Sequence, residues 1–167
     1  LETTTAWQQA CLNAKQPTCL LLSRQKLPVL HGFAEVVHAN ANKGAYVLSP
    51  AKAEAKDILI GTGSEVHLAL EAQAKLAEEG IDVSVVSMPS WDVFEQQEAA
   101  YKEAVLPAGV TKVAIEAGVP YGWSRYTGNE NNAIGITTFG ASAPGDLLME
   151  KYGFTVENVV AKVKEVL

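Results

Sequence analysis

From residue 45 onward, the chain alternates short apolar runs with longer segments whose apolar residues recur every three or four positions. Short apolar runs are typical of buried strands, and the longer period is typical of helices that lie on a sheet. We predict strands at 45–48, 57–60, 83–88, 112–115 and 134–138, and helices at 64–79, 91–105, 121–126, 144–152 and 156–167.

Strands that alternate with helices in this way are parallel and are joined by right-handed crossovers. The predicted fold is therefore α/β, a three-layer α/β/α arrangement around an open, mostly parallel sheet of about five strands. The clearest helix is 64–79, in which Val66, Leu70, Ala74 and Ala77 share one face. We expect Ser64 to cap its start and Gly80 to end it.

The first 44 residues follow a different pattern. A short helix is expected near the N-terminus, closed by Pro17. The apolar run 18–23 predicts a strand buried on both faces, whose partner strands would lie either downstream or, the interpretation we favour, in residues outside this chain. Residues 27–44 lack periodicity and predict a connection that runs over the surface. Cys11 and Cys19 fit no zinc-binding spacing, so we expect reduced core residues.

Composition and charge narrow the class of protein. The chain has 167 residues, of which 48% are hydrophobic and 19% charged, and this suits one main globular core. A net charge of −6 argues against nucleic acid as a partner, because a phosphate backbone is bound through clustered Lys and Arg. No apolar run approaches the roughly 20 residues that cross a bilayer, and the start is not signal-like. We therefore expect no membrane partner and a cytoplasmic location.

The turn formed by Gly61, Thr62, Gly63 and Ser64 is a candidate anion site, because glycines let backbone N–H groups approach a phosphate. A nicotinamide fingerprint would need a third glycine at Val66 and an acid after the next strand, so that interpretation fails. The competing interpretation is a tight turn that leads into a capped helix.

Other candidate residues are isolated. His31, His38 and His67 do not fall at the helical spacing of a metal pair, and Glu116 is a single carboxylate at the end of a strand. The aromatic residues Trp91, Trp123 and Tyr126 are expected to pack in a core or a subunit contact. Arg24 directly follows the run 18–23, and a guanidinium there suits a phosphate or carboxylate, or is simply a surface arginine.

The run Leu22-Ser23-Arg24-Gln25-Lys26-Leu27-Pro28 resembles the Ser-Arg-Gln-Asn-Leu-Pro signature of transketolases, with Lys26 where Asn is common. The likeness continues in order at 44–48, 60–66, 85–90, 116–118, 137–144 and 153–160. The chain is thus similar to the C-terminal portion of a transketolase, a thiamine diphosphate enzyme of the pentose phosphate pathway. Such an enzyme moves a two-carbon ketol unit from a ketose phosphate to an aldose phosphate.

The resemblance implies a domain organisation and a site residue. Residues 1–26 would be the last helix and strand of a truncated pyrimidine-binding domain, 27–44 a linker, and 45–167 a transketolase C-terminal domain. Arg24 would bind the phosphate of the sugar substrate. The parent enzyme would be a homodimer that binds thiamine diphosphate with Mg²⁺ or Ca²⁺.

The resemblance also limits what this chain can do. The family's Gly-Asp-Gly cofactor motif, its activating glutamate and its catalytic histidines have no counterpart here. We therefore expect no catalytic residue, no metal site and no cofactor bound by the chain alone, and a role as scaffold and dimer contact beside the remaining transketolase domains. The alternative is a stand-alone anion- or nucleotide-binding regulatory module that uses the turn Gly61 to Ser64.

Overall fold

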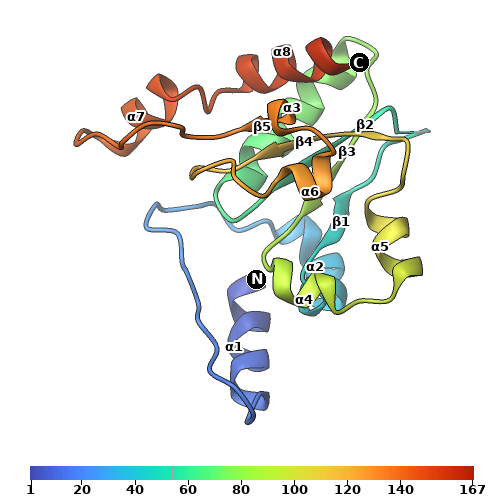
Figure 1. Ribbon diagram of the computed structural model, residues 1–167, viewed down its shortest axis with the longest axis vertical. Coiled ribbons are helices and arrows are strands. Elements are labelled where there is room, and N and C mark those ends of the chain that lie inside the picture. The colour runs from blue at the N-terminus through green and yellow to red at the C-terminus, as the bar shows by residue number, and fades with distance from the viewer. Residues whose placement is uncertain (54) are drawn as a thin grey trace.

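A five-stranded sheet lies at the centre of the protein, in a computed structural model that describes residues 1–53 and 55–167 (Figure 1). Its strands are β1 (Tyr46–Ser49), β2 (Asp57–Gly61), β3 (Val83–Ser87), β4 (Thr111–Ile115) and β5 (Ala133–Ile134). They lie in the order β1-β3-β2-β4-β5, and all but β1 run parallel. This confirms the predicted open, mostly parallel sheet.

Two strands differ from the prediction. Strand β1 pairs antiparallel with β3, because residues 50–56 are too short for the crossover of roughly a dozen residues that a parallel connection to β2 would need. Strand β5 was predicted at 134–138 but ends at Ile134. A Cβ at Gly135 would lie 2.9 Å from the carbonyl oxygen of Gly118, so the chain packs against the loop after β4 and leaves the sheet there.

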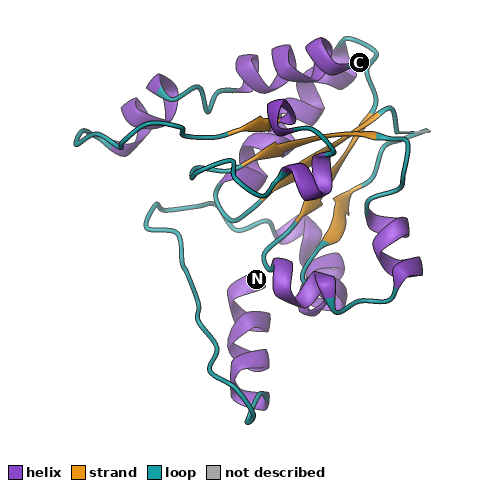
Figure 2. Cartoon of the chain, viewed as in Figure 1, coloured by secondary structure: helices purple, strands orange, loops and turns teal. Residues whose placement is uncertain are grey.

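Helices cover both faces of the sheet (Figure 2). Helices α3 (Glu65–Glu78) and α8 (Val156–Val166) pack on one face, where α7 (Gly145–Lys151) adds Met149. Helices α4 (Trp91–Glu95), α5 (Ala99–Val105) and α6 (Ser124–Thr127) pack on the other. Region 91–105 therefore holds two helices rather than one, and a short 3-10 turn η3 (Glu130–Asn132) precedes β5. None of the helices within 1–53 and 55–167 has the length and apolarity to span a membrane.

Helix α3 lies where it was predicted, but the face that it buries differs from the predicted one. Its buried residues include Val66, Ala69, Ala72 and Leu76, whereas Ala74 and Ala77 are exposed. The contact with both β2 and β3 rotates the buried stripe by about one residue from the pattern that the apolar residues suggested. The predicted cap is also wrong, because the Ser64 hydroxyl donates to the Glu65 carboxylate at 2.7 Å.

The N-terminal region contains the predicted helix, α1 (Glu2–Leu12), but not the predicted strand. Residues 13–30, which we call the Arg24 segment, form no helix or strand (Figure 2). Leu21 is 93% exposed and Leu22 60% exposed, and both cysteines are exposed, so the expectation of a buried strand and buried thiols is wrong for this chain. A strand is stable only when neighbours satisfy its backbone, and the described residues supply none there.

Residues 27–44 are more regular than predicted. They hold two 3-10 turns, η1 (His31–Phe33) and η2 (Ala41–Lys43), on either side of helix α2 (Ala34–Asn40). Val37 of α2 is buried against Tyr46, Leu48 and Val66. A helix of seven residues is too short to display a clear period, which is why the sequence pattern missed it.

Candidate functional site

The carboxyl ends of β2 and β4 form a topological switch point. The chain leaves β2 toward β3 on one side and leaves β4 toward β5 on the other, although β2 and β4 are neighbours. Open α/β sheets bind ligands most often in the crevice at such a point. The turn Gly61 to Glu65 follows β2 and the loop that starts at Glu116 follows β4, so two of the sequence candidates meet in this crevice.

Two carboxylates face each other across the switch point. Glu65 is 4% exposed, and burial raises the pKa of its carboxyl, while hydrogen bonds from the Ser64 hydroxyl and the Ala117 N–H partly offset the rise. Burial also raises the pKa of Glu116, and the nearby negative charge of Glu65 raises it further. The pair therefore resists carrying two full charges, and it makes the crevice unfavourable for an anion.

The first N–H groups of α3, which follow the turn, are already used within the protein. The Glu65, Val66 and His67 N–H groups donate to the carbonyl oxygens of Thr62, Gly63 and Ser64 at 3.2, 3.4 and 3.3 Å. The Thr62 hydroxyl donates to the carbonyl oxygen of Met88 at 3.0 Å. A Cβ at Gly61 would lie 3.0 Å from the Val66 nitrogen, so this glycine lets α3 begin close to the sheet. The geometry favours the interpretation as a tight turn over an anion site.

The Arg24 segment lies beside this turn. A groove of about 820 Å³ separates the segment from the switch point, and its lining includes Ser23, Gln25, Thr62, Gly63, His67 and Glu116. A Cβ at Gly63 would lie 3.3 Å from the Ser23 Oγ. The structure thus brings together the two candidate sites that the sequence treated separately, the arginine motif and the glycine turn.

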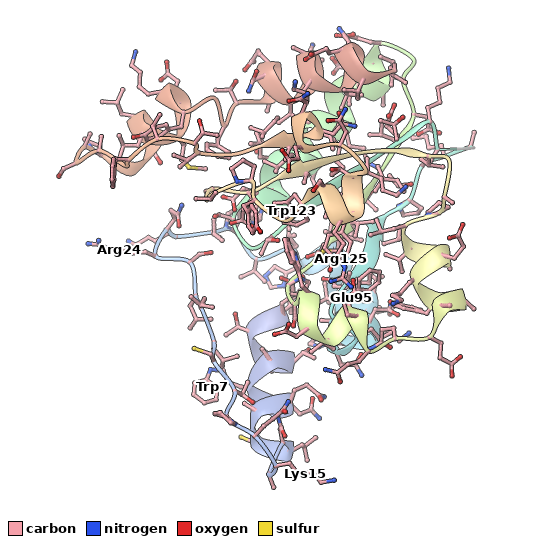
Figure 3. The ribbon with its side chains drawn as sticks, viewed as in Figure 1. Trp7, Lys15, Arg24, Glu95, Trp123 and Arg125 are labelled. Atoms are coloured by element: carbon pink, nitrogen blue, oxygen red, sulfur yellow. The ribbon has the colours of Figure 1, made fainter. Side chains whose placement is uncertain are left out.

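Arg24 itself is exposed on the outer side of the segment. Its side chain points away from the sheet and its helices (Figure 3). Within the part of the chain that the structure describes, its guanidinium forms no ion pair and no hydrogen bond. The other arginine, Arg125, is paired with Glu95 at 2.9 Å. Arg24 is therefore available to an anion that approaches from the side opposite the domain.

A group of hydrogen bonds, which the sequence did not reveal, attaches α1 to the sheet. The Glu2 carboxylate accepts hydrogen bonds from the Tyr46 hydroxyl at 2.5 Å and the Ser87 hydroxyl at 2.6 Å. Burial, followed by the charge of Glu2, raises the pKa of Tyr46 far above its usual range, so the phenol remains a donor. The three residues are 44 and 85 positions apart, and no local pattern links them.

A second polar cluster joins α4, α5 and α6 (Figure 3). The Glu95 carboxylate accepts a hydrogen bond from the Tyr126 hydroxyl at 3.0 Å and pairs with Lys102 at 3.2 Å and with Arg125. Burial alone would raise the pKa of Glu95, but these partners hold it below its usual range. Trp91 packs edge-on against Trp123 and Tyr126 above this cluster, which confirms a core role for these aromatic residues.

The histidines do not converge. His31 begins η1, His38 lies in α2, and His67 lies in the first turn of α3 beside the groove. Across 1–53 and 55–167, no group of three or more His, Cys, Asp or Glu side chains is placed to hold a metal ion.

Comparisons with known proteins identify close relatives. A family model described as the transketolase-like TK C-terminal domain matches residues 44–155. Transketolases of Halalkalibacterium halodurans and Bacillus subtilis are 51% and 53% identical over 99% of this chain, which covers 25% of each. The chain thus spans about a quarter of the length of these curated relatives.

Solved structures give the same result. A transketolase from Leishmania mexicana matches with a TM-score of 0.89 and 39% identity, over 98% of this chain and 23% of that one. A Pichia stipitis transketolase in complex with sedoheptulose 7-phosphate matches with a TM-score of 0.89 and 35% identity, over the same shares of the two chains.

Proposed function

This chain belongs to the transketolase family, and from that premise we propose that it is the C-terminal part of an enzyme that transfers a two-carbon ketol unit between sugar phosphates. The match to the last quarter of curated transketolases, in sequence and in fold, supports this assignment. The reaction runs from a ketose phosphate to an aldose phosphate. Two related Pichia stipitis structures are named as complexes with xylulose 5-phosphate and sedoheptulose 7-phosphate, both phosphorylated ketoses.

The cofactor belongs to the rest of that enzyme. Thiamine diphosphate supplies the carbanion chemistry of ketol transfer when it is bound. The described residues of this chain do not fit a metal-held diphosphate, because they contain no cluster of carboxylate, imidazole or thiol ligands and the first amides of α3 are bonded internally. We assign the cofactor, with Mg²⁺ or Ca²⁺, to segments outside this chain. The chain alone should be inactive, and ketol transfer by the purified chain would contradict that assignment.

Residues 1–26 are proposed to end the pyrimidine-binding domain, with 27–44 as linker and 45–167 as the C-terminal domain. The exposed apolar side chains Leu21 and Leu22 support this division, because strands from outside the chain would bury them. Val119, Tyr121 and Phe139 are also exposed, which supports contacts with other domains or with the second subunit of a cytoplasmic homodimer. Neither the comparisons nor the turn geometry favours a stand-alone nucleotide-binding module.

Arg24 is proposed to bind the phosphate of the sugar substrate. Its exposure and its lack of a partner among the described residues carry this proposal, since a guanidinium holds phosphate through two parallel hydrogen bonds. In the full-length enzyme, Arg24→Gln should raise the KM for xylulose 5-phosphate by roughly ten- to a hundredfold, because a hydrogen bond to a charged group contributes about 1.5–3 kcal/mol.

The experiment compares xylulose 5-phosphate with unphosphorylated xylulose, at a saturating concentration of an unphosphorylated aldehyde acceptor. The KM for xylulose should stay unchanged in Arg24→Gln, because that ketose lacks the group that Arg24 binds. Lys26→Gln is the matched control, since Lys26 is an exposed cation two residues away in the same segment. Equal effects of the two substitutions, or equal effects on the two ketoses, would overturn the assignment of Arg24.

A further inference from the structure

We infer that Gly63 is a positioning residue for substrate binding: the turn after β2 provides the surface on which Ser23 rests, and so fixes the adjacent Arg24 relative to the sugar phosphate. This inference rests on the proposed role of Arg24. It gives the glycine turn a function that requires no ligand of its own, namely to hold one segment of the enzyme against the C-terminal domain.

The two elements approach each other closely. A Cβ built at Gly63 would lie 3.3 Å from the Ser23 Oγ, which is the only heavy atom within 4 Å of that position among the described residues other than Gly63 and its two chain neighbours. Ser23 is the residue immediately before Arg24 in the chain. A displacement at Ser23 therefore moves the Cα of Arg24 directly, and the long side chain transmits it to the guanidinium.

Few contacts within the chain itself join the Arg24 segment to the C-terminal domain. Within the described part of the chain, no backbone group of residues 16–28 forms a hydrogen bond. The segment is fixed at its two ends, where Glu2 attaches α1 to the sheet and Leu30 packs near Val37. Between these ends the segment passes the switch point, where the closest approach of Ser23 to Gly63 joins its middle to the C-terminal domain.

The requirement for glycine has two separable causes. Gly63 has φ +57, a left-handed conformation that glycine adopts freely and that asparagine tolerates better than most residues. A side chain at Gly63 would also approach Ser23, because the Ser23 Oγ lies 3.3 Å from the position of a Cβ. Gly80 has φ +78 with no atom within 4 Å of a Cβ, so it has the first requirement without the second.

The test uses this matched pair in the full-length transketolase that contains the chain. Gly63→Asn should raise the KM for xylulose 5-phosphate by roughly tenfold, since a misplacement of about 1 Å in a binding group has effects of this order or larger. It should leave the KM for unphosphorylated xylulose and the kcat for both ketoses unchanged. Gly80→Asn should change none of these values. If Gly63→Asn does not fold, Gly63→Ala is compared with Gly80→Ala instead. Gly63→Ala should then raise the KM for xylulose 5-phosphate by about two- to threefold.

The outcomes separate this inference from the proposal it rests on. If Arg24→Gln raises the KM for the phosphorylated ketose but Gly63→Asn behaves like Gly80→Asn, the positioning role is overturned and the role of Arg24 stands. Equal KM changes for the two ketoses in Gly63→Asn would also overturn it, because a general structural defect does not distinguish a phosphate. If Arg24→Gln itself fails to distinguish the two ketoses, the proposed function of Arg24 fails first.

Discussion

Asp57 is fully buried at the start of β2, and among the described residues neither of its carboxylate oxygens has a hydrogen-bond partner. Burial raises the pKa of Asp57. The Thr111 hydroxyl and the charge of Lys56 lower it only in part, and the hydroxyl does not reach full hydrogen-bond geometry. A carboxyl whose folded-state pKa is raised binds its proton more tightly in the folded protein. The contribution of Asp57 to the free energy of unfolding is therefore most favourable at low pH and falls as the pH rises from the ordinary Asp value of about 3.9 through the raised value.

Asp57→Asn should remove this loss, because the amide does not titrate. Above the raised pKa of Asp57, we expect the variant to be more stable than the parent by roughly 1.4 kcal/mol for each unit by which burial raises that pKa. At pH values below about 3.9 the difference should vanish. Urea unfolding at several pH values measures it, with Glu71→Gln as the control for loss of an exposed charge on α3. A difference that does not change with pH would show that Asp57 does not titrate in this way.

The pKa values of Glu65 and Glu116 are raised for the same chief reason as that of Asp57, with the charge of Glu65 as an added cause at Glu116. Glu65 begins α3 after β2 and Glu116 begins the loop after β4, and the sheet order brings the two together. The sequence marked Glu116 as one carboxylate without a partner. Its partner became visible only when the parallel pairing of β2 and β4 was known, because 51 residues separate the two acids.

Among elements, those that a local pattern defines were predicted well. Strands β2, β3 and β4 and helices α3 and α8 lie within one or two residues of their predicted bounds, because their apolar period is repeated over a whole element. The strand at 18–23 was not found, although its apolar run is as clear as that of β2. A run of apolar residues predicts burial, but the surface that buries it has to be present.

Helix α1 shows the opposite case, an element whose position depends on one tertiary contact. Glu2→Ala should leave the Tyr46 and Ser87 hydroxyls buried without their acceptor, at a cost of about 1–3 kcal/mol for each unsatisfied group. We expect α1 to open locally while the sheet stays folded. In the variant, the amides of α1 should therefore exchange with deuterium faster than in the parent, whereas those of α3 should not. Mass spectrometry of the exchanged peptides measures this. Gln8→Ala, an exposed change on the same helix, should leave the exchange of α1 as it is in the parent.

At the scale of the whole molecule, the proposed role of this chain is to supply one binding residue, Arg24, and the structure that holds it. The sheet and its helices form a complete core, with one apolar cluster on each face. The Arg24 segment, by contrast, exposes apolar side chains on a backbone without partners. This asymmetry explains why the sequence predicts the fold of 45–167 well and the site poorly, because the proposed role of Arg24 depends on surfaces outside this chain.

Cys19 offers a direct test of how the complete enzyme is assembled. In the chain alone, both Cys11 and Cys19 are exposed, so iodoacetamide should alkylate both. If 18–23 is a strand of the pyrimidine-binding domain, Cys19 should react at least roughly tenfold more slowly in the full-length enzyme, since its alkylation would then require local opening. Mass spectrometry of the two cysteine peptides measures the rates, and urea-denatured enzyme gives the unprotected reference. Equal Cys19 rates in the chain and the native enzyme would mean that the segment stays uncovered, and the assignment of residues 1–26 to that domain would then be wrong.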